Sequence, residues 1–222
     1  QGSVMSMLGN KYQLGSLSNC IVLPKLYDSY GGIMYADQQL TQLFKRRCGV
    51  GLDISTLRPK GIPTNNSAGN STGAVSFMER FSNTTREVAQ DGRRGALMIT
   101  IDVRHPDIEE FIQIKQDLNK VTGANISIRL TDDFMQAVAK DEDYILRFPC
   151  DAKISKEGIE FDYNKTLYYK KVKAKELWDK IVKAAHTSAE PGLIFWDTQN
   201  EYCPSQVYPG FENISTNPCS EI

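Results

Sequence analysis

The 222-residue sequence has no long hydrophobic run, no excess of either charge and few cysteines. No apolar stretch approaches the roughly 18 residues that a bilayer-spanning helix needs, so we expect no transmembrane segment and no membrane partner. The 26 Lys and Arg residues nearly balance the 27 Asp and Glu residues. Proteins that grip duplex nucleic acid usually carry a basic excess, so nucleic acid is not an expected partner either.

The five cysteines form no Cys-x-x-Cys pair, which disfavours a structural zinc site, and we expect no metal ligands. A chain of this length with so few cysteines is also a poor candidate for a disulfide scaffold. The amino end has no signal-peptide pattern, so we expect reduced thiols and a cytoplasmic location. The only histidines, His105 and His186, lie far apart and beside no Ser or Cys motif, which argues against a histidine-based triad.

Helical and strand patterns alternate along the chain, and this alternation predicts an α/β fold. Short apolar strands are predicted to begin at Cys20 and to occupy 96–101, 125–130 and 192–196. Helices are predicted at 36–47, ended by Gly49, and at 73–90, capped by Ser71 or Thr72, and also at 107–114, 131–139 and 174–186. The polar segment 150–172 is predicted to be an excursion with a hairpin around Glu157 and Gly158.

The segment 59–73 is rich in Gly, Pro and Asn. It is either a long surface connection or a binding loop, because loops of this length in compact domains are uncommon and often functional.

The sharpest local pattern is Asn217-Pro218-Cys219-Ser220-Glu221. Proline pushes the residue before it toward extended geometry. If the segment continues extended, Asn217, Cys219 and Glu221 point to one face, where an amide, a thiol and a carboxylate would line one small ligand about the size of a pentose. The plainer alternative is a strand end with a buried cysteine and a solvated glutamate.

Two other features have both a functional and a plain interpretation. Cys20, at the start of an apolar run, is either a redox thiol or a buried packing residue. Arg93 and Arg94 follow Asp91-Gly92 and could grip phosphate or stack on a base, or they could be a solvated turn after a helix.

Five stretches, in this order, resemble the catalytic subunit of ribonucleotide reductase over essentially the whole chain. They are Gly15-Ser16-Leu17-Ser18-Asn19-Cys20, Arg46-Arg47-Cys48-Gly49-Val50-Gly51-Leu52-Asp53, Leu57-Arg58-Pro59-Lys60-Gly61, the segment 86–96 and Asn217-Pro218-Cys219-Ser220-Glu221. The resemblance implies a ten-stranded α/β barrel with a finger loop through its centre. Residues 1–222 would form the amino-terminal half of that barrel domain, end on the finger, and be a fragment that is inactive alone.

The resemblance also implies catalytic roles. Cys219 matches the cysteine that becomes a thiyl radical, Glu221 the base for the 3′-hydroxyl, and Asn217 the amide that holds the substrate. Cys20 matches one of two cysteines that reduce the 2′ carbon and end as a disulfide, and the second is expected beyond residue 222.

Binding roles follow in the same way. Substrate contacts are implied for Ser3, Asn19, Gly49 and Ser220. The loop at 59–73 matches the first allosteric specificity loop, with Asp28 and Arg58 as effector contacts. Residues Gln90 to Arg94 match the second loop, in which Gln90, Arg93 and Arg94 are implied to contact the effector.

The Asn-Pro-Cys form is similar to the class that depends on adenosylcobalamin, whereas the alternative is a radical from a separate metal-containing subunit. The implied partners are ribonucleoside di- or triphosphates, dNTP and ATP effectors, a thioredoxin-type reductant and, for the full-length form, a second copy in a homodimer. Two alternative functions stay open: a nucleotide-binding regulatory module without catalysis, and a related glycyl-radical enzyme.

Overall fold

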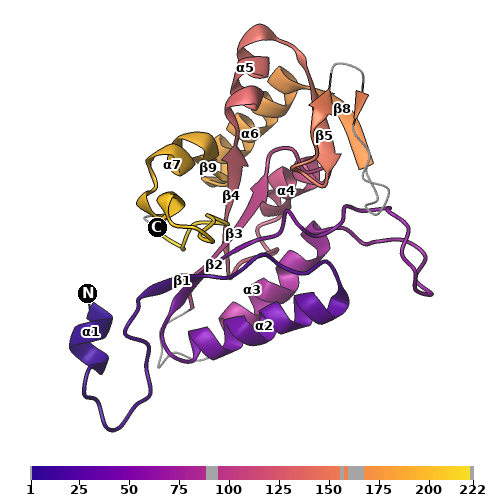
Figure 1. Ribbon diagram of the computed structural model, residues 1–222. Helices are drawn as coiled ribbons and strands as arrows, with labels where there is room; N and C mark the ends of the chain where they lie inside the picture. Colours follow the sequence, from indigo (N-terminus) through magenta and orange to yellow (C-terminus); the bar gives the residue numbers. More distant parts are fainter. Residues whose placement is uncertain (1, 89–94, 156–157, 160–167, 221–222) are drawn as a thin grey trace.

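The computed structural model describes residues 2–88, 95–155, 158–159 and 168–220, and its centre is a parallel β-sheet (Figure 1). The five strands of this sheet lie in the order β1-β2-β3-β4-β9, and every neighbouring pair is parallel. Their bounds are β1 Cys20–Val22, β2 Gly49–Asp53, β3 Leu97–Asp102, β4 Asn125–Leu130 and β9 Gly192–Phe195. Parallel neighbours need crossover connections, and helices supply them here.

The helices that connect these strands pack on one face of the sheet. Helices α2 and α3 lie side by side at the bottom of Figure 1, and α5 and α6 lie side by side at its top. Their bounds are α1 Gly2–Met7, α2 Tyr30–Phe44, α3 Met78–Glu87, α4 Ile108–Gln113, α5 Asp132–Lys140, α6 Ala174–Ser188 and α7 Trp196–Tyr202, with 3₁₀ turns η1 Val75–Phe77, η2 Ile114–Gln116 and η3 Pro204–Val207. The α/β class predicted from the sequence is confirmed.

The two faces of the sheet differ in chemistry because side chains alternate along each strand. Toward the helices point Val50 and Leu52 of β2, and Leu97, Ile99 and Ile101 of β3, all members of one buried core. The opposite face carries small or polar residues, which the strand register aligns in rows: Asp53, Thr100 and Ser127, then Asp102 and Arg129.

Two antiparallel ribbons stand apart from the main sheet. Strand β5, Asp143–Phe148, pairs with β8, Tyr168–Lys173, and β6, Ile154–Ser155, pairs with β7, Gly158–Ile159. The hairpin predicted around Gly158 is therefore confirmed by the pairing of β6 with β7. The β5–β8 ribbon was not expected from the sequence.

Several predicted boundaries are wrong. The helix expected at 36–47 begins at Tyr30 and ends at Phe44, since Ser29 accepts a hydrogen bond from the Gly32 N–H as its cap, and Arg47 adopts a positive φ of 66°. The helix expected from 73 begins only at Met78, and neither Ser71 nor Thr72 caps it.

At the other end of the chain, the strand expected to include Trp196 ends at Phe195, and Trp196 starts α7.

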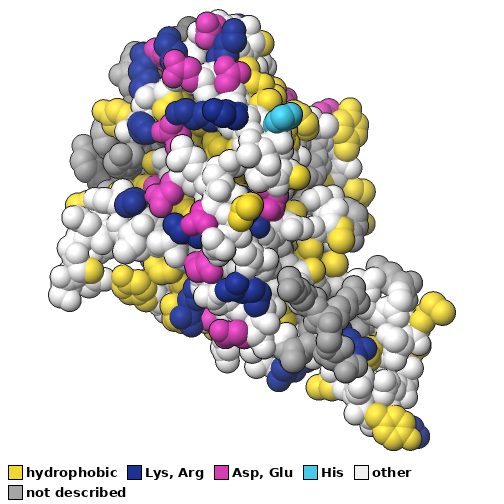
Figure 2. All heavy atoms as spheres, turned by 180° about the vertical axis from the view of Figure 1, so that it is seen from behind, with side chains coloured by type: hydrophobic (Ala, Val, Ile, Leu, Met, Phe, Trp, Pro, Cys, Tyr) yellow, Lys and Arg dark blue, Asp and Glu magenta, His cyan; other side chains and the backbone are white. Residues whose placement is uncertain are grey.

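Charged residues are mixed over the back of the molecule, where Lys and Arg alternate with Asp and Glu (Figure 2). Glu109 on α4 bonds to both Lys170 and Lys180, and those hydrogen bonds hold the pKa of its carboxyl below the usual range. None of the helices in the described part of the chain combines the length and hydropathy that crossing a bilayer requires.

Candidate active site

The segment 214–218 crosses the polar face of the sheet over β2. A Cβ atom built on Gly51 would lie 1.8 Å from the Thr216 carbonyl oxygen, and one on Gly49 would lie 3.1 Å from Cγ of Pro218. Both glycines are on the face away from the helices, so β2 leaves a groove in which the backbone of this segment fits. Residues 215–218 are buried there.

The predicted geometry of residues 217–221 is wrong in its backbone. The chain turns at this point instead of continuing extended: the Ser220 N–H donates to the Asn217 carbonyl oxygen at 3.0 Å, and Ser220 has a φ of 60°. Asn217 is fully buried, whereas Cys219 and Ser220 are exposed. Strand alternation therefore does not bring Asn217 and Cys219 to one face, and Glu221 lies outside the described residues.

The Cys20 thiol lies beside this turn. A Cβ atom on Gly49 would meet Sγ of Cys20 at 3.2 Å, about as close as it would meet the ring of Pro218. Cys20 is half-buried and pairs in register with Gly49, at the amino ends of β1 and β2. Two segments that are almost two hundred residues apart thus meet at one end of the sheet.

Three of the residues predicted to bind substrate gather at the same end. The Ser3 N–H donates to Oδ1 of Asn19 at 3.2 Å, and the Ser3 hydroxyl donates to the same oxygen. The Gly49 N–H donates to the Asn19 carbonyl oxygen at 2.7 Å. Ser220, the fourth, has its hydroxyl 3.4 Å from Oγ1 of Thr216.

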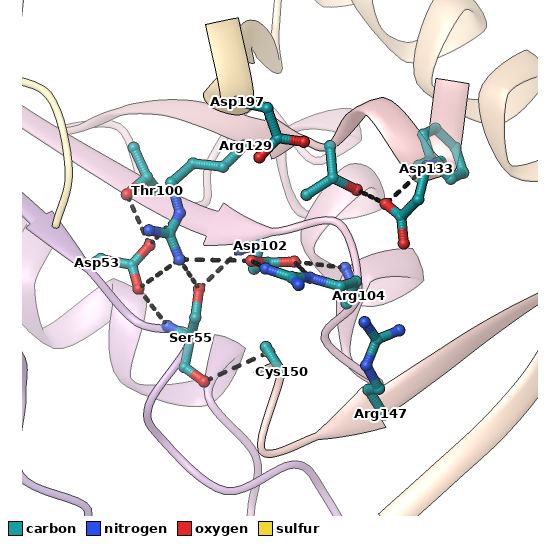
Figure 3. Close-up of polar contacts among 12 residues, drawn as sticks. Asp53, Ser55, Thr100, Asp102, Arg104, Arg129, Asp133, Arg147, Cys150 and Asp197 are labelled. Atoms are coloured by element: carbon teal, nitrogen blue, oxygen red, sulfur yellow. Dashed lines mark hydrogen bonds and ion pairs between the residues drawn. The ribbon is translucent and has the colours of Figure 1, made fainter. Parts of the chain in front are cut away.

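At the carboxyl ends of the strands, the buried Arg129 ties the segment to the sheet. Figure 3 shows its side chain among Asp53, Ser55, Thr100 and Asp102. Nη1 of Arg129 donates to the Ile214 carbonyl oxygen at 2.9 Å, and its Nε lies 3.1 Å from Oδ2 of Asp53. The Thr100 and Ser215 hydroxyls are 2.8 Å apart. The guanidinium also covers the ring of Trp196, 4.5 Å from its centroid, which is cation–π geometry.

The pKa values of two aspartates in this network are shifted in opposite directions. Burial raises the pKa of Asp53, although Arg129 and hydrogen bonds from Ser55 and Thr100 favour its charged form. Burial also opposes ionisation of Asp102, but bonds from Arg104 at 2.6 and 2.7 Å, together with the charges of Arg104 and Arg129, outweigh it and lower the pKa of Asp102.

A cavity of about 860 Å³ opens beside this network. Its walls include the paired side chains of Asp53, Asp102, Arg104 and Arg129, the face of Trp196 and the carbonyl side of Ile214. The cavity lies at the carboxyl ends of the strands, whereas Cys20 and Gly49 mark the amino ends, so the segment 214–218 runs from one region to the other.

Asp28 and Arg58, both predicted to contact an effector, are brought together in a second pocket. Nε of Arg58 lies 2.8 Å from Oδ2 of Asp28, and the Arg58 N–H donates to Oδ1 at 3.1 Å. The pocket has a volume of about 330 Å³. The loop at 59–73 forms one wall, and the other wall carries Tyr30 and Phe77, whose rings meet edge to face. The loop therefore forms part of a pocket wall, and its role as a binding loop stays a prediction.

The remaining predicted effector residues, Gln90, Arg93 and Arg94, lie outside the described residues. Among the described residues, no group of three or more His, Cys, Asp or Glu side chains is placed to hold a metal ion. Cys48 and Cys150 are buried, and burial raises the pKa of the Cys48 thiol to about 11 and that of the Cys150 thiol well above its usual value.

Sequence reasoning missed the Asp53–Arg129 network and the glycine groove. Both had a signal: Gly49, Gly51 and Asp53 alternate with Val50 and Leu52, which is the pattern of a strand with one apolar and one polar face. The polar face could not be assigned a partner, because Ser215 lies 115 positions from Thr100.

Comparison with known proteins gives the family of this chain. Its residues 18–222 match the sequence profile described as "Ribonucleotide reductase, barrel domain". The chain is 39% identical, over 94% of its length, to a vitamin B12-dependent ribonucleoside-diphosphate reductase of Thermoplasma acidophilum, of which it covers 25%.

Two further relatives extend this likeness. The chain is 34% identical over 98% of its length to the vitamin B12-dependent ribonucleoside-diphosphate reductase of Mycobacterium tuberculosis, covering 29% of that protein. It is 28% identical over 93% of its length to a ribonucleoside-diphosphate reductase large subunit of Caenorhabditis elegans. The chain thus spans between a quarter and a third of the length of these relatives, and it belongs to the ribonucleotide reductase barrel-domain family.

Proposed function

We propose that this chain is part of a ribonucleotide reductase catalytic subunit, which converts ribonucleotides into 2′-deoxyribonucleotides for DNA synthesis. The observation that carries the proposal is the meeting of two cysteine-bearing segments: the turn 217–220 lies on the glycine groove of β2, where Pro218 and the Cys20 thiol flank Gly49. A reduction that uses one thiol as radical and another as reductant requires this convergence. The turn would be the tip of the finger loop inside a closed barrel.

In the proposed mechanism the Cys219 sulfur, as a thiyl radical, removes the 3′ hydrogen of the ribose. Glu221 takes the proton of the 3′-hydroxyl, as a general base must when it is within hydrogen-bond reach. The Asn217 amide, anchored in the buried part of the segment, would hold the sugar in place. Ser3, Asn19, Gly49 and Ser220 would contact the substrate around this position.

The reduction at the 2′ carbon needs two electrons and releases the 2′-hydroxyl as water. Cys20 and a second cysteine outside these 222 residues would supply the electrons and two protons and end as a disulfide. At the end of the cycle the 3′ hydrogen returns from Cys219. A thioredoxin-type dithiol then reduces the disulfide, so that the substrate and one external dithiol yield the deoxyribonucleotide, water and an oxidised dithiol.

The radical source in this proposal is adenosylcobalamin, because the first relatives carry vitamin B12-dependent names. When bound, that cofactor supplies the unpaired electron. Cys219 fits this radical source because it is exposed at the turn, where a cofactor held by other parts of the protein could reach it. The alternative source is a separate metal-containing subunit.

The pocket at Asp28 and Arg58 would bind a dNTP or ATP effector, and the substrate would be a ribonucleoside diphosphate, as the names of the relatives suggest. An arginine can bind phosphate oxygens, and the exposed ring of Tyr30 offers a surface for a base. The full-length protein would act as a homodimer.

The test is Cys219→Ser in the full-length protein. Turnover of ribonucleoside diphosphate with adenosylcobalamin and a dithiol should fall below detection, since a hydroxyl cannot replace the thiyl radical, while dNTP binding stays intact. The matched control is Cys203→Ser, because Cys203 is a half-buried thiol bonded to Ser205 and Asn213 and is not one of the proposed catalytic cysteines. Full turnover by Cys219→Ser would overturn the role of Cys219. No turnover by the wild type, with dNTP binding intact, would favour the alternative, a nucleotide-binding module without catalysis.

A further inference from the structure

The loop at 59–73 is a two-legged projection with its own hydrogen bonds. The Gly61 N–H donates to the Ser71 carbonyl oxygen at 2.9 Å, and the Thr64 N–H donates to that of Gly69 at 2.8 Å. Between these bonds Pro63 and Asn70 form an antiparallel bridge. The loop extends away from the rest of the molecule at the right of Figure 1. Its direction is therefore set where its two legs join the fold.

One carboxylate joins both legs at that base. Asp107 accepts the Lys60 N–H on the first leg, at 3.1 and 3.2 Å to its two oxygens. Its Oδ2 also accepts the Ala74 N–H just after the second leg, at 2.9 Å. Gly73 fits there with a φ of +93°, and a Cβ atom on it would lie 2.8 Å from the same Asp107 oxygen.

Asp107 occupies the N-cap position of α4, where an aspartate usually accepts an N–H of its own helix. Here its side chain makes no such bond, and both oxygens face the loop. The residue is 8% exposed.

His105, two positions before Asp107, holds the chain just before the loop. Nε2 of the buried His105 lies 2.9 Å from the Leu57 carbonyl oxygen, and its Nδ1 accepts the Asp107 N–H at 3.0 Å. The turn after β3 thus contacts the chain at 57, at 60 and at 74. Asp107 itself is not among the residues that line the pocket of Asp28 and Arg58.

We infer that Asp107 is a positioning residue for effector binding: by holding both legs of the 59–73 loop, it sets the shape of the Asp28–Arg58 pocket without touching the nucleotide. This inference rests on the proposed function of that pocket.

The experiment compares Asp107→Asn with the wild-type full-length protein. The amide keeps the size of the carboxylate but replaces one acceptor oxygen by a donor. In either orientation of the amide its NH2 group faces the Lys60 or the Ala74 backbone N–H, so one leg is held less tightly. We expect the Kd for dTTP, dATP, dGTP and dCTP to rise at least tenfold for those that the wild type binds. Turnover without effector, the substrate KM and Tm should stay close to the wild-type values, which separates positioning from general damage to the fold.

The matched control is Glu110→Gln on the same helix. Glu110 pairs with the Lys60 ammonium at 3.7 Å and bears a charge near the loop, but it makes no bond to the loop backbone. We expect the Kd of this variant to stay within twofold of the wild-type value. If Asp107→Asn does not fold, Gly73→Ala disturbs the same contact from the side of the loop and should produce the same selective loss.

The outcomes separate this inference from the proposed function. If the wild type binds a dNTP and both Asp107→Asn and Gly73→Ala bind it as tightly, the positioning role is wrong while the pocket stands. Equal loss of effector-free turnover and effector affinity also overturns it, because Asp107 would then be only structural. If the wild type binds no dNTP, the effector pocket itself is wrong and the inference fails with it.

Discussion

The two faces of the five-stranded sheet are made by the same strands but do different things. On one face, Leu52 and Ile99 are fully buried beneath the helices. On the other, Gly51 leaves room for the backbone of Thr216, and Arg129 bonds to Ile214. The apolar face stabilises the fold through burial, at about 25 cal/mol per Å² of apolar surface.

The polar face differs from the faces of most parallel sheets, which are both apolar and covered by helices. Its glycines leave room for the backbone of the segment 214–218, and the Asp53–Arg129 pair holds one end of that segment. The comparison teaches that the stability of the domain and the placement of its cysteines depend on alternate residues of the same strands. Substitutions of Gly51 and Leu52 should therefore separate turnover from stability, whereas the buried Asp53–Arg129 pair contributes to both.

The largest effect on stability is expected at Arg129 on the polar face. Arg129→Met leaves Asp53 buried without its cation, and removing one partner of a buried ion pair costs about 3–5 kcal/mol. The free energy of unfolding of the full-length protein, measured by denaturant titration, should fall by that amount. The control is Lys170→Met, which removes an exposed partner of Glu109 and should cost no more than about 1 kcal/mol. Equal costs for both variants would mean that the polar face contributes little to stability.

The next effect is on turnover and tests the glycine groove. Gly51→Ala puts a methyl group 1.8 Å from the Thr216 oxygen, so the segment 215–217 must move. Since a displacement of about 1 Å can cost a hundredfold in rate, we expect kcat to fall by about 100-fold or more. Gly31→Ala on α2, where the nearest atom to the new methyl is 3.8 Å away, should keep the wild-type kcat.

Leu52→Ala sharpens the same contrast from the apolar face. It should cost about 2–5 kcal/mol of stability, while the folded fraction retains its kcat. A Gly51→Ala enzyme with wild-type kcat would show that the groove does not position the cysteine.

The smallest expected effect is a change in pH dependence at His105. Burial lowers the pKa of His105 below the ordinary 6.5, so at mildly acidic pH the unfolded chain binds a proton that the folded chain does not. Its contribution to stability is therefore complete above about pH 6.5 and is lost as the pH falls toward the folded-state pKa. Unfolding free energies between pH 7 and 5 should decline less steeply for His105→Gln than for the wild type. The matched control is His186→Gln, at the exposed histidine of α6.

Much of the fold could be predicted because local patterns suffice for it. The strand 125–130 was predicted with its observed bounds, and the helix at 174–186 ends only two residues later than expected. The start of α2 was missed because the Ser29 cap and the two glycines after it hide the helical pattern. The ribbon of β5 and β8 was missed because its partners are twenty or more residues apart.

The roles expected for the site residues stay predictions, and the structure adds their placement. Asp28 and Arg58, each expected to contact an effector, form an ion pair. The extended geometry expected for 217–221 is wrong, because the chain turns between Asn217 and Ser220. The role of Asp107 could not be foreseen, since a local interpretation assigns such an aspartate to its own helix.

Local sequence patterns alone determined the α/β class, most helices and strands, and the motifs typical of the family. They could do so because periodicity and turn chemistry act between residues that are near neighbours in the chain. Only the tertiary structure decided that Cys20 lies beside Pro218, that Arg129 holds Ile214 and that Asp107 joins both legs of one loop. Those contacts link residues up to about two hundred positions apart. The packing of the whole sheet brings them together, and no nearby pattern in the sequence records it.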